Sequence, residues 1–383
     1  MQDKLNPLLD FSSPSKPAAY VHVPFCARSC AYCRFYKKFP SPSDIDSYLA
    51  GVESEVGRFR RENPEAEFSS VFFGGGTPTC LSESYLERLC AAFSECAGRV
   101  EWTCEAAPGT VRRKKLEAMR SFGINRLSLG VQSFDAVTLA RLGRPHPPNA
   151  APAALEEALE TFENVNIDLI FGAEGQTRGE WLSDLARAAA SGVKHVSAYC
   201  LEFESGTSCC AGVSKEISIQ ESEAEFLGDA VATLAAAGYR HYEISNYALP
   251  GWECEHNINT WRMGCWVGFG PAAASQFGGL RRRNPADIGR WLKSVAGPER
   301  LWEDVVRLDD GEMLSSSLIF GLRMRSGVSL PTLGARFPNA DISKYAPAIS
   351  ELVREGMLEE SGGTLRITEK GVPLADAIAV ELL

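Results

Sequence analysis

Three cysteines in the segment Cys26-Ala27-Arg28-Ser29-Cys30-Ala31-Tyr32-Cys33 constrain this chain more than any other feature. They follow a short apolar run, Tyr20-Val21-His22-Val23-Pro24, that has the pattern of a buried strand. A [4Fe–4S] cluster normally takes four cysteine thiolates. Three cysteines can ligate three of its irons, which leaves the last iron open to a small chelating ligand. The spacing therefore predicts a loop that holds a reactive iron–sulfur centre.

Closely spaced cysteines have two other interpretations, half of a zinc site or thiols buried in a core. A zinc site needs a further ligand close by, but after Cys33 no cysteine or histidine occurs until Cys80. We favour the cluster because motifs farther along the chain agree with it.

The composition is that of a globular chain with a full core and a smaller second unit. The 383 residues are 45% hydrophobic and 23% charged. The net charge of -10 argues against a nucleic-acid partner, and we interpret the short basic run Arg281-Arg282-Arg283 as a solvated loop. We expect neither a transmembrane helix nor a secretory signal. The 12 cysteines lack the pattern of a small secreted domain, so we expect a cytoplasmic protein.

Short apolar runs alternate with amphipathic stretches, which is the pattern of βα units around a parallel sheet. The predicted strands are Tyr20–Pro24, Ser70–Phe73, Trp102–Ala106, Arg126–Val131, Asn166–Phe171 and His195–Leu201. The predicted helices begin at Ser43 and then cover Glu83–Glu95, Val111–Phe122, Ala150–Phe162, Glu180–Ala190 and Glu221–Ala237. This predicts an α/β fold, a partial (β/α)6 barrel, with ligands at the carboxyl ends of the strands. A further strand is expected at Tyr242–Tyr247.

The pattern changes near Pro285. Helical stretches at Asp309–Leu322 and Ile342–Glu355 precede two short runs around a Ser-Gly-Gly turn, within Met357–Ile367. Helices followed by a hairpin predict a small winged-helix-like domain. We expect a flexible tail (1–19), a core barrel (20–250), a connecting region (251–300) and a C-terminal domain (301–383).

Glycines and polar residues at the predicted strand ends are candidates for holding a ligand. Gly74-Gly75-Gly76-Thr77 follows the second strand, and glycines let the backbone approach a ligand closely. Glu105 and Gln132 end the next two strands. Asp168 lies in an apolar run, where a carboxylate is costly unless it has a partner. Arg144 can neutralise a carboxylate. His22 is either a group that tunes the cluster or a satisfied core histidine.

The C-x3-C-x2-C pattern, with an aromatic residue before the last cysteine, resembles the radical S-adenosylmethionine (SAM) superfamily. In that superfamily SAM chelates the open iron, and a low-potential electron splits its sulfonium to give a 5′-deoxyadenosyl radical. The resemblance implies a [4Fe–4S] cluster and SAM as cofactors, and an electron donor as a partner.

Several segments together resemble the oxygen-independent coproporphyrinogen III oxidase family, over essentially the whole chain from Tyr20. They are Tyr20-Val-His-Val-Pro-Phe-Cys, Gly74-Gly-Gly-Thr-Pro-Thr, Glu105-Ala-Ala-Pro-Gly-Thr, Asn125-Arg-Leu-Ser-Leu-Gly-Val-Gln-Ser-Phe and Asp168-Leu-Ile-Phe-Gly. One branch of the family decarboxylates two propionates of coproporphyrinogen III. The other is a haem chaperone that passes haem to acceptor proteins such as respiratory enzymes, and such acceptors would bring peripheral membrane contact.

Three features favour the chaperone branch. Phe35 stands where true oxidases carry another cysteine, and only a short tail precedes Tyr20. His256-Asn257-Ile258-Asn259-Thr260-Trp261 resembles the chaperone's HNxxYW motif, although Thr260 replaces its tyrosine. The resemblance therefore implies His256, Asn257 and Trp261 as haem-binding residues, and haem as a ligand.

The resemblance also implies the remaining site residues. Cys26, Cys30 and Cys33 would ligate the cluster. The positions that match SAM contacts are Tyr20, Tyr32, Gly75, Gly76, Thr77, Glu105, Gln132, Arg144 and Asp168, and Tyr32, Gly76, Thr77, Gln132, Arg144 and Asp168 match a second SAM site of the oxidase branch. Besides haem transfer, two activities stay open: coproporphyrinogen III oxidation, and radical chemistry on another tetrapyrrole.

Overall fold

A computed structural model of the chain describes residues 16–28, 30–33, 35–144, 147, 149–201 and 218–383. Most of the expected tail 1–19 therefore lies outside the described residues. Within the described part, no helix combines the length and the apolar character needed to cross a bilayer.

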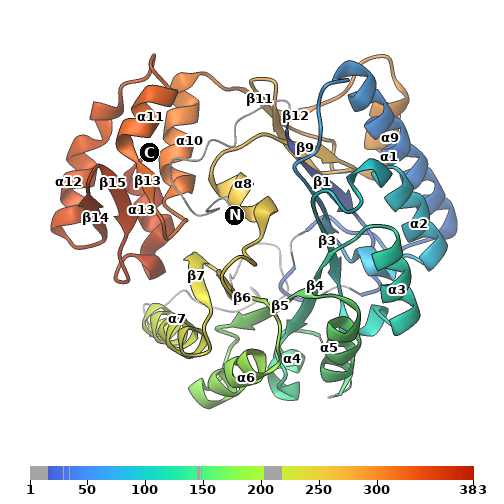
Figure 1. Ribbon diagram of the computed structural model, residues 1–383, viewed down its shortest axis with the longest axis horizontal. Helices are drawn as coiled ribbons and strands as arrows, with labels where there is room; N and C mark the ends of the chain where they lie inside the picture. The colour runs from blue at the N-terminus through green and yellow to red at the C-terminus, as the bar shows by residue number, and fades with distance from the viewer. Residues whose placement is uncertain (1–15, 29, 34, 145–146, 148, 202–217) are drawn as a thin grey trace.

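Six parallel strands form the centre of the molecule. They are β1 (Ala18–Val23), β2 (Ser70–Gly75), β3 (Glu101–Ala106), β4 (Arg126–Gln132), β5 (Asn164–Phe171) and β6 (His195–Cys200), and each pairs with the next in chain order. Helices cover the outside of this curved sheet (Figure 1): α1 (Pro42–Glu62), α2 (Glu83–Ala91), α3 (Arg113–Ser121), α4 (Ala136–Arg141), α5 (Ala150–Thr161), α6 (Arg178–Ala190) and α7 (Ser218–Ala236). The predicted α/β class and partial barrel are confirmed.

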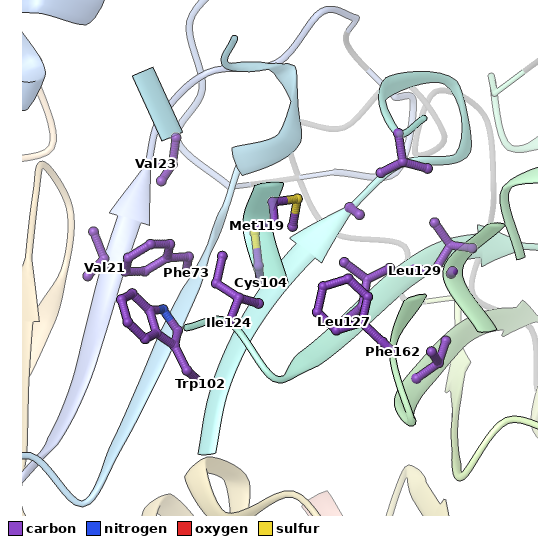
Figure 2. Close-up of a cluster of buried hydrophobic side chains, with 14 of the residues drawn as sticks. Val21, Val23, Phe73, Trp102, Cys104, Met119, Ile124, Leu127, Leu129 and Phe162 are labelled. Atoms are coloured by element: carbon purple, nitrogen blue, oxygen red, sulfur yellow. The ribbon is translucent and has the colours of Figure 1, made fainter. Parts of the chain in front are cut away.

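The two faces of the barrel strands differ because successive side chains of a strand point to opposite faces. Val21, Phe73, Trp102 and Leu127 point outward, and Figure 2 shows them in one cluster with Met119 of α3. The alternate positions carry polar groups that line an inner cavity instead, including Glu105, Ser128, Asp168 and Ser197. The apolar half of each strand thus holds the helices, and the polar half is free for a ligand.

Four strands extend the sheet beyond β1. The first, β9 (Trp266–Phe269), is parallel to β1, and β10 (Ala274–Phe277), β11 (Leu280–Arg283) and β12 (Glu303–Arg307) follow antiparallel. The interpretation of Arg281-Arg282-Arg283 as a solvated loop is wrong, because these residues form β11 and pair with β10. The expected connecting region 251–300 therefore supplies sheet strands, together with α8 (Glu255–Trp261) and α9 (Ile288–Ala296).

At the other end of the sheet, the predicted strand Tyr242–Tyr247 is two strands. They are β7 (Arg240–Glu243) and β8 (Asn246–Ala248), which run antiparallel, and β8 pairs antiparallel with β6. The chain reverses between them, where the Glu243 carboxylate accepts a hydrogen bond from the backbone N–H of Ser245 at 3.2 Å. A carboxylate that binds a backbone group two residues on favours a turn over an extended run.

A second core belongs to the C-terminal part of the chain. Its elements are α10 (Asp310–Gly321), β13 (Val328–Ser329), α11 (Leu330–Arg336), α12 (Ala346–Arg354), β14 (Leu358–Ser361), β15 (Thr364–Ile367) and α13 (Ala375–Glu381). The hairpin β14–β15 turns at Gly362 and Gly363, both with positive φ, as the Ser-Gly-Gly pattern predicted. Figure 1 places α8 between this unit and the barrel, which makes α8 the bridge between the two cores.

Candidate functional site

A cavity of about 800 Å³ opens inside the barrel at the carboxyl ends of the strands. We call it the cluster cavity because all three motif cysteines line it. Pockets of this size take ligands of several tens of atoms. The sequence-predicted site residues on its wall are Cys26, Cys30, Tyr32, Cys33, Gly75, Gly76, Thr77, Glu105, Gln132, Arg144, Asp168 and Asn257.

The cysteine loop lies at the mouth of the cluster cavity. Cys26, Cys30 and Cys33 are half-buried free thiols, and Cys26 Sγ lies 3.7 Å from Thr77 Oγ1. Among the described residues, no group of three or more His, Cys, Asp or Glu side chains is placed to hold a metal ion. Three thiolates from one loop are the donor set that a cubane takes, one thiolate for each of three irons.

The glycine segment after β2 forms a close turn against the cysteine loop. Gly75 adopts a φ of +102°, a backbone conformation that glycine reaches without strain. The N–H of Gly76 donates to the Val23 carbonyl at 2.8 Å, and the N–H of Thr77 donates to the Phe25 carbonyl at 2.7 Å. These two bonds tie the turn to the chain just before Cys26. The turn thus presents bare backbone to the cavity beside the expected cluster.

Two acidic side chains stand on the inner wall of the cavity. The Glu105 carboxylate accepts a hydrogen bond from the Gly75 N–H at 3.2 Å, and Asn166 Nδ2 donates to the Asp168 carboxylate at 2.8 Å. Burial, together with the nearby charge of Asp168, raises the pKa of Glu105 to about 8. Burial also raises the pKa of Asp168, against the hydrogen bonds that its carboxylate accepts. A cationic ligand would offset the cost of ionising these buried carboxylates, because its charge stabilises their ionised form.

Gln132 ends β4, the strand between those of Glu105 and Asp168, and Arg144 lines the same cavity. The Arg144 guanidinium donates to the hydroxyl of Tyr32 at 2.9 Å, which links it to the cysteine loop. Gln132 has a φ of +69°, which is unusual for a residue with a side chain and costs about 1–3 kcal/mol. Asp184 of α6 holds the following residues by accepting bonds from Ser133 Oγ and the Phe134 N–H. The strained residue is thus kept in place by buried contacts.

These features fit SAM, which carries a sulfonium, an ammonium and a carboxylate. The cavity offers Glu105 and Asp168 to the cationic groups and Arg144 to the anionic one. When bound, the cluster and SAM supply a low-potential electron and a reducible sulfonium. The roles of the individual residues stay predictions.

Sequence reasoning missed several polar residues of the cluster cavity. Arg126, Ser128, Asn166, Ser197 and Tyr199 line it beside the predicted residues. They occupy alternate positions of β4, β5 and β6, so the period-2 pattern of polar residues within otherwise apolar strands was the available signal.

A second cavity, of about 570 Å³, lies beyond β1. We call it the histidine cavity. Its described lining is mostly aromatic or small: Tyr20, His22, Phe35, Tyr36, His256, Thr260, Trp266, Ala272, Ala274, Arg283 and Ala286. Phe35 lines both cavities and is 64% exposed. Tyr20, expected as a SAM contact, lines this cavity and not the first.

The two histidines of this cavity differ in what their rings can still bind. His22 Nε2 donates to the Tyr36 carbonyl at 3.0 Å, so Nδ1 accepts from the Tyr20 hydroxyl at 3.1 Å, and both ring nitrogens are used. His256 Nδ1 pairs with Ser70 Oγ at 3.1 Å, while its Nε2 has no hydrogen bond to a described residue. Burial lowers the pKa of His256 to about 4. His256 is therefore a neutral imidazole with one nitrogen available to a ligand.

The three residues of the HNxxYW-like segment face different surroundings. His256 lines the histidine cavity and Asn257 lines the cluster cavity. Trp261 lines neither among the described residues; it stacks on Phe320 of α10 at 6.3 Å between ring centroids, and the Arg323 guanidinium lies 4.9 Å from its ring. The structure thus does not bring Trp261 together with His256 at one cavity.

Comparison with known proteins agrees with this geometry. Residues 20–188 match the radical SAM superfamily, and residues 308–374 match the HemN C-terminal domain. The solved structure of coproporphyrinogen III oxidase (HemN) from Escherichia coli superimposes with a TM-score of 0.83, covering 100% of this chain and 93% of that one. The two sequences are 21% identical, so this likeness shows the fold.

Curated relatives are more similar in sequence. The heme chaperone HemW of Bacillus subtilis is 30% identical over 94% of this chain and 97% of its own length. The heme chaperone HemW of Mycobacterium tuberculosis is 32% identical over 97% and 96%. The bovine mitochondrial radical S-adenosyl methionine domain-containing protein 1 is 31% identical over 100% and 92%. The expected chaperone branch is confirmed: this chain belongs to the HemW family of radical SAM proteins.

Proposed function

We propose that this protein binds haem in the histidine cavity and transfers it to acceptor proteins, with His256 as an axial ligand of the iron. The observation that carries the proposal is the free Nε2 of His256 in a cavity whose described lining is mostly aromatic or small. Histidine is a common axial ligand of haem iron, and a neutral imidazole is the form that binds metal. The heme chaperones among the relatives support the same ligand.

The surroundings of His256 also prepare it for this role. Its Nδ1–H can donate to Ser70 Oγ, which fixes the tautomer that leaves Nε2 unprotonated. Glu101 of β3 accepts the backbone N–H of His256 at 3.3 Å and so anchors the start of α8. Phe72 lies against the imidazole with 5.0 Å between ring centroids. The imidazole is held by β2, β3 and its own helix before any ligand arrives.

Anaerobic titration of the cluster-loaded protein with haem tests the proposal. The expected result is one tight haem, whose binding His256→Ala abolishes and Ser70→Ala weakens about tenfold through the lost orientation of the ring. His241→Gln is the matched control, because His241 lines neither cavity and stacks on Tyr247. Equal haem affinity of His256→Ala and the control would remove His256 from the site.

We further propose that the cluster cavity binds the [4Fe–4S] cluster through Cys26, Cys30 and Cys33, and SAM through the residues on its wall. An external electron donor would be needed to reduce the cluster. Loss of the iron–sulfur absorption in Cys30→Ala, with unchanged circular dichroism, is the expected result. A Cys30→Ala protein that keeps the full absorption would contradict this ligand set.

Coproporphyrinogen III oxidation is the second candidate, because the fold is that of HemN and the cluster cavity is intact. The test supplies coproporphyrinogen III, SAM and a reductant without oxygen. We expect no protoporphyrinogen IX, since Phe35 stands where true oxidases carry a further cysteine.

The free thiols of the described cysteines support our placement of the protein in the reducing cytoplasm. We also propose two functional units: the core barrel expected over 20–250, to whose sheet 251–300 adds β9 to β11, and a C-terminal domain over 301–383.

A further inference from the structure

The histidine cavity has one described charged side chain on its wall, and that charge is positive. Arg283 lies at the end of β11, and its neighbours in the lining are aromatic or small residues together with Thr260 and the two histidines. The cluster cavity contrasts with it, because Glu105, Asp168, Arg126 and Arg144 all line that cavity. A mostly apolar cavity with a single cation suits a flat apolar ligand that carries a carboxylate.

Arg283 is held in a geometry that leaves part of its guanidinium unused. Its Nε donates to Asp304 Oδ2 at 2.8 Å and its Nη2 lies 2.7 Å from the same oxygen. Glu303 lies 3.6 Å from Nη2. No ion pair of Nη1 to a described residue accompanies these contacts. The pair with Asp304 is half-exposed, so it orients the guanidinium and is weak enough to share it with another carboxylate.

We infer that Arg283 anchors a carboxylate of the tetrapyrrole in the histidine cavity, while His256 faces its centre. This inference rests on the proposed haem binding and adds the chemical group of the ligand that the protein recognises, a carboxylate. The ligand class is a planar tetrapyrrole with free propionate groups, as opposed to its esters. Arg283 is a specificity-determining residue in this arrangement, because a guanidinium binds carboxylates by charge-assisted hydrogen bonds that an ester cannot accept with equal strength.

The strands β9 to β11, which extend the sheet beyond β1, form the wall of the histidine cavity that carries Arg283. Residues Ala272 and Ala274 on this wall are small, so their side chains leave room for a ligand beside Arg283. Phe35 stands exposed at the mouth, where an aromatic ring can cover a planar ligand. Arg282, the next residue, stacks on Trp302 with its guanidinium carbon 3.9 Å from the ring centroid, and it does not line the cavity.

The test compares haem with haem dimethyl ester, by anaerobic absorption titration of the full-length protein. We expect the native protein to bind the free acid at least about tenfold more tightly than the ester, as one charge-assisted bond allows. Arg283→Gln should bind both ligands equally, with the affinity that the native protein has for the ester. Asp304→Asn is the matched control: it breaks the same ion pair but keeps the guanidinium, so its preference for the free acid should persist.

Two outcomes overturn the inference. One is an Arg283→Gln protein that keeps the preference, and the other is an Asp304→Asn protein that loses it to the same degree. The same titrations with metal-free protoporphyrin IX and its dimethyl ester need no iron ligand, so they test Arg283 separately from His256. If His256→Ala abolishes haem binding but Arg283→Gln still discriminates, only the inference fails. If the native protein binds none of the four ligands, both the inference and the proposed function fail.

Discussion

Replacing Gly75 by alanine is expected to lower the free energy of unfolding and to distort the cluster cavity. The alanine would strain the backbone, and its Cβ would collide with His22. Gly75 has a φ of +102°, which an alanine adopts only at a cost of about 1–2 kcal/mol. An alanine Cβ would also lie 2.9 Å from His22 Cγ and closer still to the Nδ1 and Cε1 atoms of that ring. The ring must therefore move or the turn must open.

The collision with His22 accounts for the larger share of the expected loss in stability. His22 bridges the Tyr20 hydroxyl and the Tyr36 carbonyl, and each of these bonds contributes about 1 kcal/mol. Forcing extra atoms into a packed site costs about 1–3 kcal/mol more. The expected loss for Gly75→Ala is thus about 4–7 kcal/mol in the free energy of unfolding. A displaced turn should also weaken SAM binding, because Gly75 and Gly76 line the cluster cavity.

Gly98 offers a matched control for the backbone part alone. Its φ is +70°, and a Cβ placed on it would meet no atom within 4 Å. Gly98→Ala should therefore cost only about 1–2 kcal/mol. Urea unfolding of the apo-protein, followed by circular dichroism, measures both variants. Equal destabilisation of the two variants would contradict the collision with His22. A double-mutant cycle in which adding His22→Ala to Gly75→Ala recovers none of the extra loss would contradict it as well.

Three further predictions concern buried groups around the two cavities. Glu105→Gln should flatten the pH dependence of stability. Because the pKa of Glu105 is raised to about 8, the folded protein keeps this proton at pH values where the unfolded chain has released it. Between about pH 4.5 and 8 the unsubstituted protein should therefore lose about 1.4 kcal/mol of stability per pH unit, which the variant retains. Parallel pH profiles of the two proteins would contradict this. Trp261→Ala should lower the free energy of unfolding by about 2–3 kcal/mol through the lost stacking on Phe320, and Trp261→Phe should recover most of that loss. Denaturant titration measures both variants, and an alanine variant as stable as the unsubstituted protein would count against the stacking role. Asp184→Asn should cost about 2 kcal/mol, because a charged acceptor for Ser133 Oγ and a backbone N–H is lost, and calorimetry at neutral pH would expose a smaller effect.

The barrel could be predicted from the sequence because its signals are local. Each of the strands β1 to β6 is a short, mostly apolar run, and a helix follows each of them before the next strand. The cysteine spacing and the glycine turn are likewise local, and the barrel topology brings them together at one end of the sheet. This is why eleven of the cluster and SAM residues that the resemblance implied line the cluster cavity, which Asn257 of α8 joins from outside the barrel.

The strands β9 to β12 escaped prediction because nothing local marks them. They are four or five residues long, lie in a segment rich in glycine, and depend on the pairing of Ala18–Val21 with Trp266–Phe269, far away in the chain. Short strands have little propensity of their own, and their partners supply the stability. The Arg281-Arg282-Arg283 run was misread for the same reason, since its charge suggested solvent and its partner strands were not visible.

Three thiols spaced for a cluster, a glycine turn and acidic groups at strand ends can all be recognised in the unfolded chain, and they define the chemistry that this protein can carry. Those properties depend on residue type and short spacing, which the chain holds before it folds. That His256 and Arg283 share a cavity, and that Trp261 lies against α10, follows from the packing of the folded chain and from no local pattern. The reason is that β9 to β11 must pair beside β1, and α8 must pack between two cores, before these distant residues meet.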